Sequence, residues 1–302
     1  MMLCGVIPIL ATPFNDDESL DLVSWQRLIR FMLDAGADGL TILGVLGEAN
    51  RLTDAERDSL ISSAVTTVEG RVPLVVGVSH AGTFAAGVLA ARAEELGASA
   101  VMLAPHKEPV ANDERIVELY KRVARATSLP IVLQDHPAST EVQMSAALIA
   151  RIVDSVPSIQ AIKAEAVPTA PKIRALREQC KTHVAILAGL GALYAPFDLA
   201  EGIDGFNTGF AFPEVLKAMV SAAHSGNFAR VHALYARFAA LIVFEQQPGL
   251  AVRKEILRRR GMIASARVRH PGAALPAGSA LHLDRLLAAA FGGQDLSHKL
   301  EV

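Results

Sequence analysis

The sequence predicts an α/β protein of the (β/α)8 TIM-barrel class with an appended C-terminal helical region. Two observations support this prediction. Short apolar runs alternate with amphipathic stretches eight times along residues 1–225, and this alternation is typical of a parallel sheet covered by helices. No long polar linker interrupts it, so a single closed barrel is favoured over two separate domains.

The eight expected strands are short apolar runs bounded by turn residues. They are Gly5–Ala11, Gly39–Leu43, Leu74–Val78, Ala100–Leu103, Ile131–Leu133, Gln160–Lys163, Val184–Leu187 and Gly205–Thr208. Helical periodicity between them is clearest at Leu22–Ala35, Asp54–Val68, Ala85–Leu96, Asp113–Thr127 and Ala146–Val153. Thr53 and Glu56 form a capping box that begins the second of these helices. A doubly wound open sheet is the main alternative, but the sequence lacks the early glycine fingerprint of that fold.

Residues 226–302 return to helical periodicity. Three further helices are expected at Phe228–Phe244, Leu250–Arg260 and Ala280–Phe291, with the Pro- and Gly-rich segment Arg267–Gly278 as a connector. We therefore expect residues 1–225 to form the barrel. Residues 226–302 are expected to form a helical extension that packs on the barrel and either caps it or builds an oligomer contact.

Composition excludes several classes of protein. The net charge of -2 provides no general attraction to nucleic acid or to an anionic membrane. The two cysteines, Cys4 and Cys180, lack zinc-type spacing and form no disulfide framework, so a cytoplasmic location is expected. Pro8 and Pro13 interrupt an apolar start without a basic region, which indicates a first strand rather than a signal peptide. No apolar run is long enough to span a bilayer.

Lys163 stands in an apolar run that reads as a short buried strand. A buried lysine is unfavourable unless it is paired or chemically used. Removing an amine from water favours its neutral form, which attacks a carbonyl carbon to form a Schiff base. Glu165 lies two residues further on, and the two-residue period of a strand places both side chains on one face. The segment alone leaves two interpretations open, an imine-forming pair and a structural ion pair.

Polar residues follow several other expected strands at the end where barrel enzymes place their active sites. These residues are Gly44–Glu48 after the second strand, Ser79 and His80 after the third, His106 and Lys107 after the fourth, Gln134–His136 after the fifth, and Asn207 and Thr208 near the end of the eighth. We expect them to converge with Lys163 on one mouth of the barrel.

These motifs resemble, in order and spacing, those of the dihydrodipicolinate synthase/N-acetylneuraminate lyase family. The turn Gly44-Val45-Leu46-Gly47-Glu48 is similar to the Gly-Thr-Thr-Gly-Glu turn of that family. Further matches over about residues 5–244 are Gly77-Val78-Ser79, Pro130–Pro137, Ile162-Lys163, Ala188-Gly189 and Gly205–Thr208. The resemblance implies a class I aldolase-type barrel in which Lys163 forms an imine with a small-molecule 2-oxo acid. It also implies a homotetramer, and no cofactor or metal is expected.

Three departures from the family pattern lie at positions that take part in the family's reaction or bind its substrate. Gln134 stands in place of the usual tyrosine, Val45 and Leu46 in place of two threonines, and Ser139 in place of an arginine. These changes argue against both dihydrodipicolinate synthase and N-acetylneuraminate lyase activity. Gln134–Pro137, Lys163-Ala164-Glu165 and Gly209–Glu214 instead resemble a tyrosine-less branch represented by L-2-keto-3-deoxyarabonate dehydratase.

The resemblance to this branch implies dehydration of a 2-keto-3-deoxy pentonate to 2-oxoglutarate semialdehyde. Lys163 and Glu165 are the expected catalytic residues, with Glu165 removing the proton at C3 of the imine. The expected substrate-binding residues are Val45, Leu46, Gly47 and Glu48 through their backbone N–H groups, Gln134, His136, Gly189, and Asn207 and Thr208 through sugar hydroxyls. The Glu48 side chain itself is expected to order the turn or cap the next helix.

Four other functions remain open at this level. The first two are a retro-aldol lyase that releases pyruvate from a 2-keto-3-deoxy acid and a dihydrodipicolinate synthase-like condensation, both of which also use Lys163. The third is a zinc site built from His80, His106, His136 and Asp135, although no closely spaced histidine pair concentrates these ligands. The fourth is a degenerate barrel that acts as a binding protein.

Overall fold

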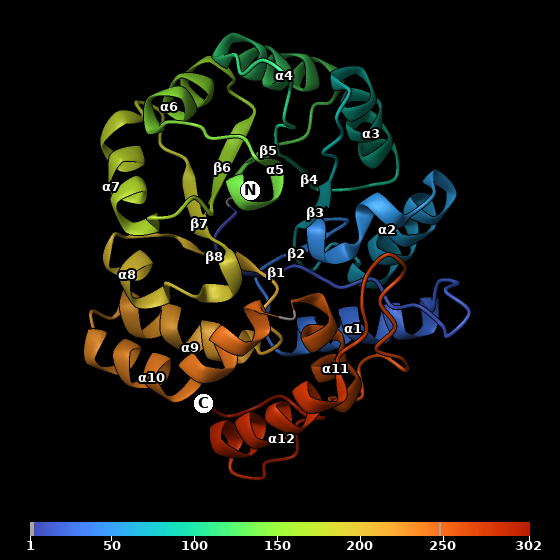
Figure 1. Cartoon of the computed structure of the whole chain (residues 1–302). Coiled ribbons are helices and arrows are strands. Elements are labelled where there is room, and N and C mark those ends of the chain that lie inside the picture. The colour runs from blue at the N-terminus through green and yellow to red at the C-terminus, as the bar shows by residue number, and fades with distance from the viewer. Residues whose placement is uncertain (1–2, 248) are drawn as a thin grey trace.

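The computed structural model describes residues 3–247 and 249–302, in which eight parallel strands form a ring surrounded by helices (Figure 1). The strands are β1 Gly5–Pro8, β2 Leu40–Ile42, β3 Leu74–Gly77, β4 Ala100–Leu103, β5 Ile131–Asp135, β6 Ile159–Ala164, β7 Ala185–Ala188 and β8 Gly205–Thr208. Strand β1 pairs with β8, and a bridge between Ile9 and Thr41 joins β1 to β2. The predicted TIM barrel is confirmed.

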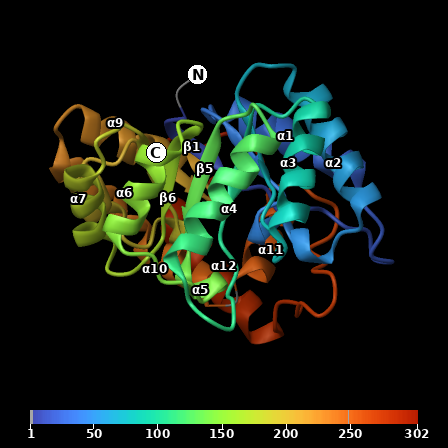
Figure 2. The same ribbon diagram turned by 90° about the horizontal axis from the view of Figure 1, so that it is seen from above.

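The helices that alternate with the strands cover the outside of the ring, except for the short helix Pro137–Thr140, which lies over one end of the ring (Figure 1). They are α1 Leu22–Asp34, α2 Asp54–Val68, α3 Thr83–Glu95, α4 Asp113–Ala126, α5 Pro137–Thr140, α6 Ala146–Ser155, α7 Thr169–Gln179, α8 Ala195–Ala200 and α9 Pro213–His224. The Thr53 hydroxyl accepts from Glu56 N, and the Glu56 carboxylate accepts from Thr53 N, which confirms the capping box at the start of α2. Figure 2 shows α5 and the C-terminal helices toward the same end of the barrel.

Apolar side chains form one small cluster inside the ring and a larger one between the strands and the helices. A register shift at the start of the β5–β6 pairing leaves Gln160 unpaired, so that Val132 faces Ala161. Beyond this bulge, Ala161 packs in the inner cluster and Ile162 in the outer one. The alternation places Lys163 on the inner face, where barrel enzymes carry their chemistry.

The C-terminal region consists of α10 Phe228–Gln246, α11 Leu250–Arg259 and α12 Ala277–Phe291. In Figure 1, α10 lies beside α9 and α12 lies outside α11. The Arg260 guanidinium at the end of α11 is buried, pairs with Glu214 of α9 at 2.6 Å, and lies over the rings of Phe31 and Phe212. Buried ionic and aromatic contacts therefore join these helices to the barrel. None of the helices in the described residues has the length and apolarity needed to cross a membrane.

Asp198 in α8 is a carboxyl group buried between the helices that surround the barrel. Its side chain is 2% exposed and accepts a hydrogen bond from the Thr169 hydroxyl. Burial raises the pKa of Asp198 to about 6, and the Thr169 hydrogen bond opposes this shift only in part. The folded state therefore binds this proton more tightly than the unfolded state. The stability that this proton contributes is fully present below pH 3.8 and is lost as the pH rises through 6.

We expect Asp198→Asn to be more stable than the wild type by roughly 3 kcal/mol at pH 7, because asparagine carries no charge to bury. The difference should vanish near pH 4, where Asp198 is protonated in the folded protein. Urea unfolding at both pH values measures this. Asp34→Asn, at an exposed position, is the control and should show no such pH dependence. An equal difference between wild type and Asp198→Asn at both pH values would contradict the assignment.

Candidate active site

A buried lysine–carboxylate pair stands where β6 ends. Lys163 and Glu165 point to the same side, as the two-residue period predicted, and Lys163 Nζ lies 3.0 Å from Glu165 Oε2. The side chains are 3% and 5% exposed, respectively. Glu165 N donates to Asp135 O at 3.0 Å, which continues the β5–β6 ladder and fixes the backbone under the carboxylate. The pair is therefore held rigidly and shielded from water.

Two further donors orient the Glu165 carboxylate. Gln134 lies opposite Lys163 in the β5–β6 register, and its Nε2 donates to Glu165 Oε2 at 2.8 Å. Leu190 N, after β7, donates to Oε1 at 3.2 Å. Burial alone would raise the pKa of Glu165, but the charges and hydrogen bonds from Lys163, His136 and Gln134 outweigh it and hold the pKa below its ordinary value. The carboxylate is thus ionised at neutral pH and able to accept a proton.

His136 lies at the edge of this group. Its Nδ1 is 4.0 Å from Glu165 Oε2 and 2.7 Å from the hydroxyl of Ser139, the residue at the position of the family's arginine. Burial lowers the pKa of His136, and Lys163 adds to this while Glu165 opposes it. The imidazole is therefore neutral at pH 7. It can form hydrogen bonds, but it does not carry a proton to donate as a general acid.

Asp135 faces outward from the barrel, as expected for a strand residue next to the inward-facing Gln134. It is fully buried and forms an ion pair with Lys172 of α7, whose Nζ also donates to Met144 O. Burial raises the pKa of Asp135, and Lys172 opposes the shift. The pair ties the end of β5 to α7 and to the β5–α6 connection. Lys172 was not foreseen, although the outward position of Asp135 was a signal that a partner lies in the helix layer.

The turn after β2 offers fewer donors than expected. Val45–Gly47 form a 3₁₀ turn in which Gly47 N donates to Gly44 O at 3.0 Å and Glu48 N donates to Val45 O at 3.1 Å. Of the four amides of residues 45–48, those of Val45 and Leu46 are left without an acceptor among the residues that the structure describes. The expectation that all four amides bind a carboxylate is corrected, because the turn's own hydrogen bonds occupy the last two.

The Glu48 side chain orders this turn from within the protein. It is 1% exposed, its Oε2 accepts from Arg51 Nη1 at 2.7 Å and from Arg269 N at 2.9 Å, and its Oε1 pairs with Lys254. These contacts direct the carboxylate toward the C-terminal segment rather than into the barrel mouth.

The two polar residues of β8, Asn207 and Thr208, differ in whether they keep a hydrogen-bonding atom free for a ligand. Asn207 donates to Ile7 O at 2.9 Å and to the Thr41 hydroxyl at 2.8 Å, whereas its buried Oδ1 has no partner among the described residues. The Thr208 hydroxyl accepts from Gly191 N at 2.7 Å. Thr208 therefore supports the turn after β7, and Asn207 retains one acceptor for a ligand hydroxyl or water.

Gly189 is required by its proximity to Glu165. A Cβ at this position would lie 2.2 Å from Glu165 Oε1 and 2.3 Å from Glu165 Cγ, far closer than nonbonded atoms can approach. The absence of a side chain at 189 lets the turn after β7 approach closely enough for Leu190 N to reach the carboxylate. Gly189 thus shapes the site, and its expected contact with substrate stays a prediction.

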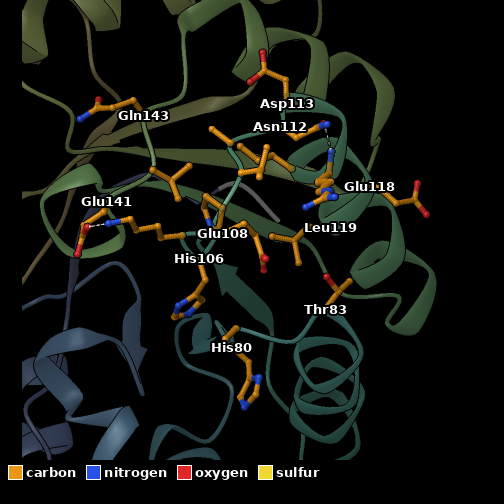
Figure 3. A pocket seen from close by; sticks show the side chains of 18 of the residues that line it. His80, Thr83, His106, Glu108, Asn112, Asp113, Glu118, Leu119, Glu141 and Gln143 are labelled. Atoms are coloured by element: carbon orange, nitrogen blue, oxygen red, sulfur yellow. Dashed lines mark hydrogen bonds and ion pairs between the residues drawn. The ribbon is translucent and has the colours of Figure 1, made fainter.

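A cavity of about 540 Å³ reaches Gln134, the donor to Glu165, from the surface, and Val45, Met102 and Ser139 also line it. A second cavity of about 550 Å³ lies further out, between the β4–α4 connection and α4. Figure 3 shows His80 and His106 on one side of this outer cavity and Asn112 and Asp113 on the other. His80 and His106 line both cavities, so the two adjoin. Of the pair, only the inner cavity reaches Gln134.

The four side chains that the sequence suggested as zinc ligands, His80, His106, His136 and Asp135, do not converge on one point. Across residues 3–247 and 249–302, no three His, Cys, Asp or Glu side chains form a group that could hold a metal ion. Asp135 faces Lys172 in the helix layer, His136 is bonded to Ser139, and His106 lies at the exposed rim. Asp135 and His136 therefore lie apart from His80 and His106, which contradicts the zinc-site interpretation.

The fold and the site define a (β/α)8 barrel with a buried lysine–carboxylate pair at the C-terminal ends of its strands. The chain belongs to the dihydrodipicolinate synthetase family, whose model matches residues 2–290. It is therefore an aldolase-like lyase of that family.

Named relatives fall into two groups. The chain is 35% identical over 281 residues to the L-2-keto-3-deoxyarabonate dehydratase of Azospirillum brasilense, with 88% of each chain covered. It is 37% identical over 207 residues to the 4-hydroxy-tetrahydrodipicolinate synthase of Stenotrophomonas maltophilia, with 68% of each covered.

Solved structures agree with this placement. The dihydrodipicolinate synthase of Rhodopseudomonas palustris is similar with a TM-score of 0.91 at 34% identity, covering 95% of this chain and 97% of the other. A prophage protein of the same family from Escherichia coli, solved in complex with pyruvate, is similar with a TM-score of 0.88 at 26% identity, covering 96% and 99%.

Proposed function

We propose that the protein dehydrates a 2-keto-3-deoxy sugar acid, such as L-2-keto-3-deoxyarabonate, through an imine on Lys163. The observation that supports this most is that Gln134, in place of the usual tyrosine, holds Glu165 beside Lys163 in a buried pair. Chemistry that depends on a tyrosine hydroxyl at position 134 has no donor there, whereas a dehydration needs a base beside the imine. The similarity to the Azospirillum dehydratase supports the same assignment.

The first step is imine formation. The Lys163 ammonium loses a proton to water, and the neutral amine, which lies 3.0 Å from Glu165, attacks C2 of the 2-oxo acid. The C2 oxygen departs as water after protonation, and a protonated imine remains on Lys163. The substrate carboxylate is placed at the amides of Val45 and Leu46, because these donors have no other acceptor in the described part of the turn.

The second step is elimination. The protonated imine withdraws electrons, so Glu165 removes a proton from C3 to form an enamine. The C4 hydroxyl then leaves as water with a proton returned by Glu165, directly or through a water molecule. Tautomerisation and hydrolysis release 2-oxoglutarate semialdehyde and restore Lys163, so the net change is the loss of one water. General acid–base catalysis of this kind contributes ~10²–10⁴-fold.

Trapping and product analysis test the assignment together. Borohydride reduction in the presence of pyruvate or L-2-keto-3-deoxyarabonate should leave a reduced adduct on Lys163, identified by peptide mass spectrometry. Turnover of the pentonate should yield the semialdehyde without pyruvate. No adduct with any 2-oxo acid in a folded sample would refute the imine mechanism, and an adduct without turnover would support a binding protein.

A retro-aldol lyase is the second candidate. The structure of the Escherichia coli relative in complex with pyruvate favours it, because pyruvate is the product of cleavage between C3 and C4. Release of pyruvate and glycolaldehyde from the pentonate would replace the dehydratase assignment. Condensation as in the synthase relatives would instead consume pyruvate. The homotetramer expected from the family resemblance stays a prediction.

Gly189→Ala should lower kcat by roughly 10²-fold, within the range of general acid–base contributions. The added Cβ collides with the Glu165 carboxylate and displaces it from Lys163. Steady-state kinetics with the pentonate measures this effect. Gly278→Ala is the matched control, because a Cβ there meets open space. Full activity of a folded Gly189→Ala variant would mean that the position of Glu165 is not critical.

A further inference from the structure

The turn that receives the substrate carboxylate depends on its backbone. Val45 and Leu46 carry no hydroxyl, so they can hold an anion through their two free amides but not through their side chains. The direction of an amide is set by the backbone dihedral angles around it. Any contact that fixes the backbone of residues 44–48 therefore governs how well a carboxylate is bound.

Glu48 closes this turn in a conformation that favours glycine. Its φ of 54° and ψ of 34° lie in the left-handed region, which is unfavourable by roughly 1–2 kcal/mol for a residue with a Cβ. The buried carboxylate makes contacts that compensate for this, with Arg51, with Arg269 N and with Lys254. The conformation of the turn thus depends on the partners of the Glu48 side chain.

Lys254 is the most deeply buried of these partners. It lies on α11, is fully buried, and pairs with Glu48 Oε1. Its Nζ also donates to Arg267 O at 2.6 Å and lies 4.4 Å from the centre of the Phe14 ring. The Arg269 guanidinium covers the same ring at 4.2 Å. One amine therefore joins the turn after β2, the segment after β1 and the C-terminal connector.

We propose that Lys254 is a positioning residue for the substrate carboxylate, acting through Glu48 on the amides of Val45 and Leu46. The proposal rests on the proposed function, since it assumes that a 2-oxo acid carboxylate binds at this turn. Lys254 contacts Glu48 rather than Lys163, so its loss should weaken carboxylate binding without removing the imine-forming amine.

The charge of Lys254 makes this support sensitive to pH. Burial lowers the pKa of Lys254 to about 8, with Glu48 opposing the shift and Arg51 and Arg269 adding to it. These are the charged groups that face it, from the turn, from the 3₁₀ segment Ala49–Arg51 and from the connector. As the pH rises through 8, the amine becomes neutral and Glu48 loses this ion pair. Preference for a carboxylate should fall over the same interval.

The test compares pyruvate with methyl pyruvate, which has the same ketone but no carboxylate charge. Half-saturating concentrations for borohydride trapping are measured in the wild type, Lys254→Met and Lys254→Arg. The preference for pyruvate should fall about 10-fold in Lys254→Met, as for loss of a charge-assisted interaction, with the saturated trapping rate within about 2-fold. Lys254→Arg should restore most of the preference. Lys217→Met is the matched control, because it breaks a half-exposed ion pair with Asp38.

The pH profile adds a readout that a purely structural role would not change. The wild-type preference should decline through pH 8, whereas that of Lys254→Arg should stay level to pH 9, because arginine remains protonated. The ratio of the two ligands cancels the pH dependence of imine formation itself, which both ligands share.

Four outcomes would count against the proposal. An unchanged preference in folded Lys254→Met would overturn it, and so would the same loss of preference in Lys217→Met. If Lys254→Met does not fold, Glu48→Gln tests the same pair, and an unchanged preference there would overturn the proposal equally. Absence of any adduct in the wild type would refute the proposed function, and with it this inference, whereas a wild-type adduct with unaltered variants would refute the inference alone.

Discussion

Replacement of Lys163 by alanine is expected to abolish the borohydride-trapped adduct and to lower turnover of the pentonate by more than ~10⁴-fold. This exceeds the ~10²–10⁴-fold contribution of general acid–base catalysis, because the covalent route itself disappears with the amine. Lys163 lies 3.0 Å from Glu165 inside the barrel, and in the proposed mechanism its amine is the nucleophile. Peptide mass spectrometry and steady-state kinetics measure the two effects.

Removing one member of a buried ion pair also destabilises a protein by about 3–5 kcal/mol. Lys163→Arg keeps the positive charge beside Glu165 and separates the two effects, because a guanidinium does not form the imine. Lys181→Ala, at an exposed position, controls for general loss of a lysine. An adduct that persists in Lys163→Ala would place the nucleophile elsewhere, and residual turnover in Lys163→Arg above 1% of wild type would exclude an obligatory imine.

Replacement of Glu165 by glutamine is expected to leave the pyruvate adduct on Lys163 while turnover of the pentonate falls ~10²–10⁴-fold. Glutamine preserves the size of the side chain and one acceptor for Gln134 and Leu190, but it cannot accept the C3 proton. The pKa of Glu165 is held below its ordinary value by Lys163, His136 and Gln134 despite burial, so in the wild type the base is ionised throughout the neutral range. Turnover should therefore be limited by protonation of Glu165 only below pH 4.5.

Glu95→Gln, at an exposed position on α3, is the control for removal of a carboxylate and should leave both readouts unchanged. Unchanged turnover in Glu165→Gln would remove Glu165 from the chemistry. Loss of the adduct together with turnover would instead assign Glu165 to imine formation. Measuring adduct and turnover on the same samples distinguishes these cases.

The residues that local periodicity controls were predictable. Alternation along β6 placed Lys163 and Glu165 on one face, and the bulge at Gln160 leaves this intact because it precedes both residues. The helices that were given ranges were found within three residues of their expected ends. No range was expected for α7, α8 or α9. The helix α8, Ala195–Ala200, has only six residues, which are too few for a helical period to stand out.

Main-chain donors were not predictable in the same way. Leu190 N orients Glu165, and the amides of Gly47 and Glu48 are occupied by the turn itself. Every non-proline residue carries an N–H group, so residue type does not indicate which amide is free. The backbone path decides this, and in the turn after β2 that path is a 3₁₀ turn.

The Lys254–Glu48 pair shows that the partner of a buried side chain is also not predictable from local sequence. A lysine on the same face of α11 as Leu250 and Leu257 was a signal of a buried charge, but its partner lies 206 residues away in the sequence. That partner is brought close only by closure of the barrel and by packing of the C-terminal helices.

The sequence by itself determined the barrel class, the interior position of Lys163 and its carboxylate two residues away, because pleat and helical period are local properties of the chain. Tertiary structure alone decided which amides remain free for an anion, that Asp135 pairs with Lys172, and that α11 reaches the turn after β2. These features depend on how distant segments meet in space, which no local pattern encodes.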